Sequence, residues 1–136
     1  MGGTIVCDVT DVPAGQSAAA FASALGARLG LRLVLVCVGP AAEQRLEAIA
    51  RELGHGADTR VAVGDHAEAL ARVAAEEGAD LVVVGARPAG LGGRNLRWAL
   101  ARELEAATPV PVVVAPPSTR KRSDRRLAIA ADADPR

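Results

Sequence analysis

The sequence is poor in aromatic side chains: Phe21 and Trp98 are the only two, and tyrosine is absent. Half of the 136 residues are nevertheless apolar, so the core must be built mainly from Ala, Val, Leu and Ile. No apolar run approaches the ~20 residues that a membrane-spanning helix needs. We therefore expect one domain with a substantial core and no membrane association.

Cysteine and lysine are also scarce. Cys7 and Cys37 lie inside apolar runs, so we expect small buried thiols in a reducing compartment. The first residues lead directly into a strand-like run without the pattern of a signal peptide, which predicts a cytoplasmic protein. The one lysine, Lys121, lies near the C-terminus, which excludes a phosphate loop of the Gly-x-x-x-x-Gly-Lys-Ser/Thr type.

The residues that usually carry metals or catalysis are few. His55 lies between glycines and His66 begins a predicted helix; we expect both to face solvent. Neither histidine has a partner at metal-ligating spacing, so no metal site is predicted. No serine has a recognisable histidine and aspartate partner, and no paired carboxylates indicate hydrolysis. We predict no catalytic residues and no enzyme, although slow ATP hydrolysis is left open.

Hydrophobic periodicity predicts five short strands that alternate with four helices. The strands are expected over residues 4–8, 31–38, 59–63, 80–85 and 109–117, and the helices over residues 14–29, 41–53, 65–77 and 95–107. Such alternation indicates an α/β fold with a parallel sheet and helices on both faces. Prolines flank the last strand, and polar and apolar residues alternate along the third strand. Both strands are therefore expected at sheet edges.

In such a sheet, ligands bind at the carboxyl ends of the strands. The residues that end strands there are Asp8, Val38, Gly64 and Gly85. Asp8 is the one carboxylate that we single out for function; the alternative is a cap of its own loop or of the next helix, with Thr10 and Ser17 nearby.

The loop over residues 86–93 is rich in glycine and precedes a helix, an arrangement that favours anions such as phosphate. Two interpretations stay open. Gly92, Gly93 and Arg94 could form a nest of backbone N–H groups that binds an anion. Alternatively, the glycines make only a flexible or tight turn.

Several segments together resemble the universal stress protein family across residues 4–117. They cover residues 5–8, 18–22, 33–38, 63–70, 78–87 and 108–114. The resemblance implies a three-layer, doubly wound, five-stranded parallel sheet of order 3-2-1-4-5, the adenine-nucleotide-hydrolase-like fold. We expect this domain to occupy residues 1–117, followed by a basic, disordered tail over residues 118–136.

The resemblance also implies a nucleotide site. In nucleotide-binding members, ATP lies across the strand ends, and its phosphates lie on Gly-x-x-Gly followed nine residues later by Gly-Ser/Thr. The nucleotide-binding residues predicted here are Asp8, Val38, Val84, Gly85, Arg87, Gly90, Gly92, Gly93 and Asn95. No cofactor is firmly predicted; ATP and AMP are the candidates.

Three residues depart from that phosphate-binding pattern. Pro88 stands at the second glycine, where it removes a backbone donor and fixes its own φ. Trp98 places a large ring where a phosphate would approach the peptide closely, and Ala99 lacks a hydroxyl group. These departures predict weak or absent ATP binding.

The resemblance further implies a homodimer joined through the fifth strand, with Val112, Val113 and Val114 at the interface. An unpaired apolar strand at a sheet edge otherwise invites aggregation. The predicted function is a non-enzymatic, universal-stress-protein-like module in the stress response. The alternative is an ATP- or AMP-binding regulatory switch that uses the crevice over Asp8, Val38 and residues 85–93.

The C-terminal tail has a different charge balance from the rest of the chain. Residues 118–136 contain five arginines and Lys121 against three aspartates. We expect a solvated tail, with contact to an anionic partner as the alternative. Nucleic-acid binding is not expected because no aromatic side chains interleave with the basic ones.

Overall fold

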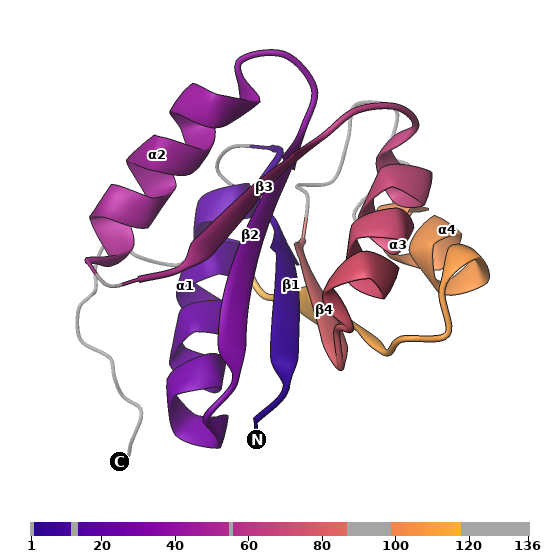
Figure 1. Cartoon of the computed structure of the whole chain (residues 1–136). Coiled ribbons are helices and arrows are strands. Elements are labelled where there is room, and N and C mark those ends of the chain that lie inside the picture. The colour runs from indigo at the N-terminus through magenta and orange to yellow at the C-terminus, as the bar shows by residue number, and fades with distance from the viewer. Residues whose placement is uncertain (1, 12–13, 55, 87–98, 118–136) are drawn as a thin grey trace.

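The computed structural model describes residues 2–11, 14–54, 56–86 and 99–117 (Figure 1). In these residues the chain alternates strictly between strand and helix, as predicted. The elements are β1 (Thr4–Asp8), α1 (Ala14–Leu29), β2 (Arg32–Val38), α2 (Ala42–Leu53), β3 (Asp58–Ala62), α3 (His66–Glu77), β4 (Leu81–Gly85), α4 (Ala99–Ala107) and β5 (Val112–Ala115). The fifth strand is shorter than the predicted 109–117, because prolines at both ends cannot continue the ladder.

The strands form one parallel sheet in the order β3-β2-β1-β4-β5, which confirms the predicted order. The central strand β1 pairs with β2 and β4, so that Ile5 lies opposite Leu33 on one side and Leu81 on the other. β3 and β5 are the two edges, as predicted. Because every strand runs in the same direction, all carboxyl ends meet at one end of the sheet.

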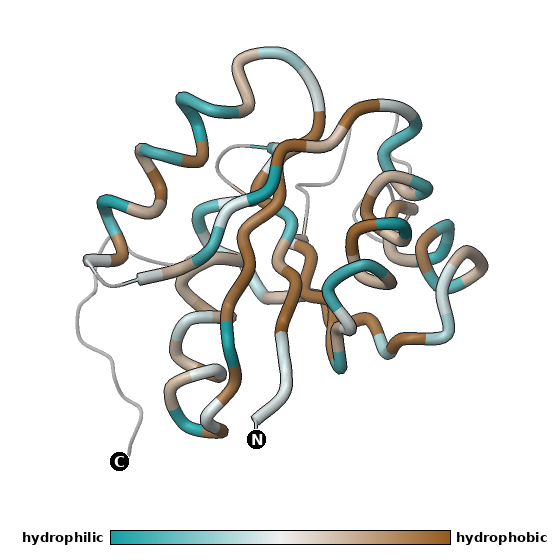
Figure 2. The backbone as a smooth tube through the Cα atoms, viewed as in Figure 1, coloured by the Kyte–Doolittle hydropathy of each residue, from teal (hydrophilic) through white to brown (hydrophobic). Residues whose placement is uncertain are grey.

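Two helix layers cover the two faces of the sheet (Figure 1). α1 and α2 pack over one face and α3 and α4 over the other, each with its own cluster of buried residues. Side chains of β1 alternate between them: Ile5 and Cys7 face α1 and α2, and Val6 faces α3 and α4. Figure 2 shows the central strands as the most hydrophobic part of the chain. The core is aliphatic, as the composition predicts.

Helix ends follow local sequence rules. The Asp65 carboxylate accepts a hydrogen bond from the Glu68 N–H at 3.1 Å and so caps the start of α3. Gly54 and Gly78 end α2 and α3 with φ of 75° and 65°, a conformation that glycine adopts without a side-chain clash. These two turns determine where the following strands, β3 and β4, begin.

Both thiols are buried and free, as predicted. Burial raises the pKa of the Cys7 thiol well above its usual value, and the nearby Asp8 carboxylate raises it further. Burial also raises the pKa of Cys37. Both groups therefore stay protonated near neutral pH, and they act as small apolar side chains in the core.

Candidate functional site

Three of the predicted site residues lie on one face of the sheet at its carboxyl end. Asp8 ends β1, Val38 ends β2, and Val84 lies next to the end of β4. Val84 belongs to the cluster under α3 and α4, and Val38 packs against that cluster. Asp8 points to the same face, because side chains two residues apart along β1 share a face and Val6 belongs to that cluster.

Gly85, the fourth predicted residue, lies against α1. A Cβ atom built at this position would lie 2.7 Å from the carbonyl carbon of Ala14, the first residue of α1. The missing side chain therefore allows α1 to approach the end of β4. The sequence predicted a nucleotide contact here and missed this packing role, which depends on a neighbour 71 positions away in the chain.

The Asp8 carboxylate is almost completely buried, with 5% of the side chain exposed, and it is bonded within the chain. Its Oδ1 accepts hydrogen bonds from the backbone N–H of Thr10 at 3.1 Å and from Thr10 Oγ1 at 2.5 Å. Its Oδ2 lies 3.1 Å from His66 Nε2. Since a carboxylate only accepts, Nε2 is the donor in this contact. A buried carboxylate needs such donors to offset its lost hydration.

Thr10 extends this network to two more elements. Its hydroxyl oxygen accepts a hydrogen bond from the Val38 N–H at 3.0 Å, so it links the ends of β1 and β2. Its carbonyl oxygen accepts a hydrogen bond from the guanidinium group of Arg45 on α2. The alternative prediction, in which Asp8 caps its own loop, is thus realised through Thr10.

His66 is the functional candidate that the sequence interpretation placed wrongly. We predicted a solvent-facing histidine, but its side chain is 27% exposed and contacts Asp8. α3 begins at His66, at the carboxyl end of the sheet, and it packs on β1 and β2. The sequence did offer one signal for this contact. Asp8 ends β1 and His66 begins the helix after β3, so both lie at the carboxyl end of the sheet. The 58 residues between them hid the contact.

The remaining predicted residues cannot be placed on this site. Arg87, Gly90, Gly92, Gly93 and Asn95 lie outside the described residues, as do Pro88, Trp98 and His55. Ala99 is described and begins α4. The predictions for the glycine-rich loop therefore stay predictions.

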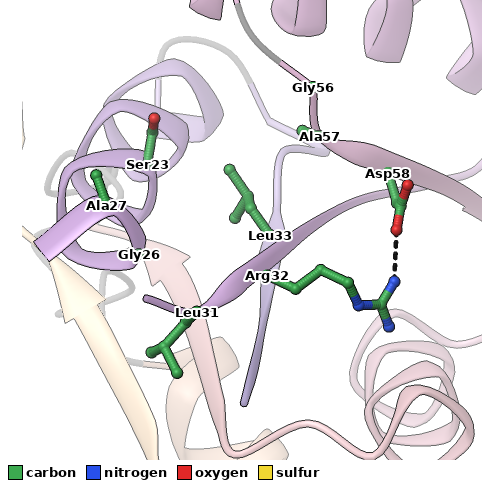
Figure 3. Close-up of a pocket in the computed structure, with 9 residues that line it drawn as sticks. All are labelled: Ser23, Gly26, Ala27, Leu31, Arg32, Leu33, Gly56, Ala57 and Asp58. Carbon is green, nitrogen blue, oxygen red and sulfur yellow. Dashed lines mark hydrogen bonds and ion pairs between the residues drawn. The ribbon is translucent and has the colours of Figure 1, made fainter. Parts of the chain in front are cut away.

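A hollow of about 540 Å³ lies at the opposite end of the sheet, against the amino ends of β2 and β3 (Figure 3). Its lining comes from α1, β2 and the start of β3: Ser23, Gly26, Ala27, Leu31, Arg32, Leu33, Gly56, Ala57 and Asp58. The guanidinium of Arg32 is bonded to the Asp58 carboxylate at 2.5 Å. Ligands of doubly wound folds bind at the carboxyl ends of strands, so we assign no function to this hollow.

Within the described ranges, no group of three or more His, Cys, Asp or Glu side chains could hold a metal ion. The same part of the chain has no helix of the length and apolar character that crossing a membrane requires. The candidate site is therefore the polar network of Asp8, Thr10, Arg45 and His66, beside Val38 and Val84. We call the four polar residues the Asp8 network.

Comparison with known proteins gives one family and many similar folds. A model of the universal stress protein family matches residues 39–116, which is more than half of the chain. No curated protein sequence matches significantly.

Three solved structures illustrate the likeness. A universal stress protein from Archaeoglobus fulgidus is 19% identical, with a TM-score of 0.68, over 85% of this chain and 99% of that one. A universal stress protein in complex with cAMP is 24% identical, with a TM-score of 0.69, over 85% and 98%. The universal stress protein from Archaeoglobus fulgidus in complex with dAMP is 17% identical, with a TM-score of 0.60, over 83% and 97%. At these identities, the likeness shows a common fold.

Proposed function

The chain belongs to the universal stress protein family, and from this premise we propose a non-enzymatic stress-response module that acts as a homodimer and binds ATP weakly or not at all. The observation that carries the proposal is the state of the Asp8 carboxylate. This group would meet the ribose or base of a nucleotide, and Thr10 and His66 already occupy both of its oxygens.

A nucleotide would gain little by replacing these partners. One hydrogen bond contributes a net ~0.5–1.5 kcal/mol, and exchanging an internal donor for a ligand donor leaves the number of bonds unchanged. The residues Pro88 and Trp98, predicted to obstruct the phosphates, act in the same direction. Calorimetric titration with MgATP should therefore give no measurable heat in the micromolar range. Tight binding that is lost in Asp8→Ala would contradict this part of the proposal.

The homodimer is supported by the difference between the two sheet edges. The carbonyl groups of Pro111 and Ala115 accept hydrogen bonds from Val82 and Ala86, so these positions face β4. By alternation, the backbone groups of Val112 and Val114 face the open edge. Their side chains are half-buried. In contrast, most of β3 is exposed and it carries Asp58 and Arg60, which discourage strand pairing.

A proline substitution tests the dimer without removing a bond to β4. Val114→Pro deletes an outward-facing N–H donor, and proline is tolerated on an edge strand. We expect this variant to be a folded monomer in light scattering, whereas Val114→Ala, the control that keeps the donor, stays dimeric. A wild-type protein that is monomeric at high concentration would contradict the homodimer.

An ATP- or AMP-binding switch is the second candidate. It is supported by the position of Asp8 beside Val38 and Val84, and by the two similar structures that contain cAMP and dAMP. Joint substitution of Trp98→Gly and Ala99→Ser should strengthen ATP binding if the rest of the site is competent. Unchanged binding in a folded double variant would count against this candidate.

A further inference from the structure

The two oxygens of the Asp8 carboxylate are held differently. Thr10 donates to Oδ1 twice, from the backbone and from the hydroxyl group, within the same short loop. In the part of the chain that the structure describes, Oδ2 is held by His66, which belongs to another element. A ligand that approaches Asp8 would therefore find Oδ2 easier to free than Oδ1.

His66 can release this oxygen without disturbing the core. Its side chain is 27% exposed, whereas Asp8 is 5% exposed, so the imidazole ring has a path towards solvent. The following residue, Ala67, is buried and anchors the first turn of α3. Rotation of the ring about its side-chain bonds would thus leave the helix in place.

We propose that His66 sets the affinity of this site, because it competes with the ligand for Asp8 Oδ2. The inference rests on the proposed function in one respect: the ligand is taken to be an adenine nucleotide, whose ribose hydroxyl or base amino group would donate to Asp8. Beyond the proposed function, the inference identifies His66 as a residue that weakens nucleotide binding. Removing the imidazole should free one acceptor that the ligand then takes.

Protonation of His66 should strengthen the competition, because an imidazolium ion pairs with a carboxylate more strongly than a neutral ring does. The described charged groups at this end of the sheet include Asp8 itself, Asp11 in the following loop, Glu43 and Arg45 on α2, Asp65 and Glu68 at the start of α3, and Arg72, whose guanidinium donates to the Val63 carbonyl. In α4, the first residues packed here are the apolar Leu100 and Ala101. Ligand affinity should therefore fall as the pH falls through the titration of His66.

Nucleotide titrations of three variants and the wild type test this competition. We expect His66→Ala to bind AMP and MgATP roughly three- to tenfold more tightly than the wild type, the change expected for one freed hydrogen-bond acceptor. The gain should vanish when His66→Ala is combined with Asp8→Ala. Glu68→Ala, an exposed change in the same helical turn, should leave the affinity unchanged. Equal or weaker binding by His66→Ala would overturn the proposal.

A second measurement does not depend on nucleotide. The ring protons of His66 can be followed by NMR across pH in the full chain, in the wild type and in Asp8→Asn. Loss of the carboxylate should move the titration midpoint to lower pH. An unchanged midpoint would overturn the proposal, as would a shifted midpoint without any nucleotide binding by His66→Ala. Tight ATP binding by the wild type would instead contradict the proposed function.

Discussion

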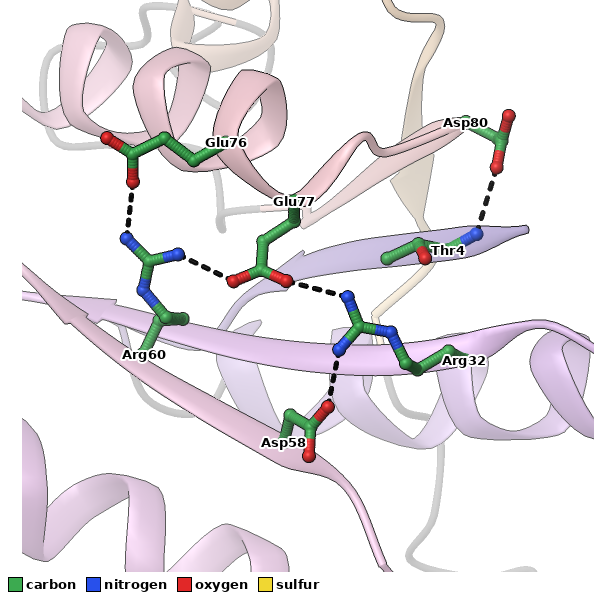
Figure 4. A network of polar contacts seen from close by, with 7 residues as sticks. All are labelled: Thr4, Arg32, Asp58, Arg60, Glu76, Glu77 and Asp80. Carbon is green, nitrogen blue, oxygen red and sulfur yellow. Dashed lines mark hydrogen bonds and ion pairs between the residues drawn. The ribbon is translucent and has the colours of Figure 1, made fainter. Parts of the chain in front are cut away.

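The carboxyl end and the amino end of the sheet use polar side chains differently. At the carboxyl end, the Asp8 network surrounds one buried carboxylate and links β1, β2, α2 and α3. At the amino end, Arg32 bonds the carboxylates of Asp58 and Glu77 at 2.5 and 2.6 Å (Figure 4). Arg32 and Asp58 are 46% and 62% exposed. The carboxyl end therefore holds a buried carboxylate, Asp8, whereas the Arg32–Asp58 pair at the amino end is exposed.

This difference between the two ends indicates which of them could bind a ligand. Exposed ion pairs contribute only ~0–1 kcal/mol each, because water already solvates both partners. A buried carboxylate is retained at a desolvation cost, and removing its donors is expensive. The amino-end pairs therefore mainly give the edge strand β3 a charged surface, whereas the Asp8 network is the feature that a ligand could exploit. The predictions below contrast matched changes at the two ends.

The largest expected effect comes from adding one methyl group at the carboxyl end. Gly85→Ala would place a Cβ against the backbone of Ala14, so α1 or β4 must shift. We expect the free energy of unfolding to fall by about 3 kcal/mol, measured by chemical denaturation. The control is Gly56→Ala at the amino end, where no atom lies within 4 Å of the added Cβ. Equal losses in the two variants would show that the close packing at Gly85 is not required.

Removing one carboxylate from each end gives the second contrast. Asp8→Ala leaves the Thr10 and His66 donors without their acceptor, so we expect a loss of about 2 kcal/mol in unfolding free energy. Asp58→Ala should cost less than ~1 kcal/mol, since Arg32 keeps Glu77 as a partner. A larger loss for Asp58→Ala would reverse the comparison between the two ends.

Backbone strain also distinguishes the ends. Glycines take positive φ at both ends, Gly30, Gly54 and Gly78 before strands and Gly39 and Gly64 after them, but among the described residues only the turn after β2 also places a residue with a Cβ there, Ala41 at φ of 60°. This left-handed conformation costs about 1 kcal/mol for a residue with a Cβ. Ala41→Gly should therefore raise the unfolding free energy by up to ~1 kcal/mol in thermal or chemical denaturation. A destabilised variant would mean that the strain is outweighed by the entropy that glycine loses on folding.

The smallest effect concerns the pH dependence of the amino end. Hydrogen bonds from Arg32 and then Arg60 lower the pKa of Glu77 below its usual 4.5. A carboxyl with a lowered pKa contributes stability above its unfolded pKa, and this contribution disappears as the pH falls through the folded value. Glu77→Gln should thus be slightly less stable than the wild type at neutral pH and equally stable in acid. A difference that persists in acid would point to packing as its cause.

Much of this fold could be predicted from the sequence, because its rules are local. Aliphatic runs predicted the strands, and the apolar periodicity between them predicted helices such as α3. The strand order came from the family resemblance and is confirmed. The contact of His66 with Asp8 and the packing of Gly85 on Ala14 were missed, because each joins distant segments. Only the assembled sheet shows that the predicted ligand carboxylate already has internal partners.

The most direct test of the account is an NMR titration of the nucleotide-free wild-type protein with MgATP. If the Asp8 carboxylate is already occupied, shifts should be small, confined to Thr10, Val38 and His66, and far from saturation at micromolar nucleotide. Saturation at stoichiometric ATP would contradict the account, and so would shifts that gather around Ser23, Leu33 and Ala57 at the amino end.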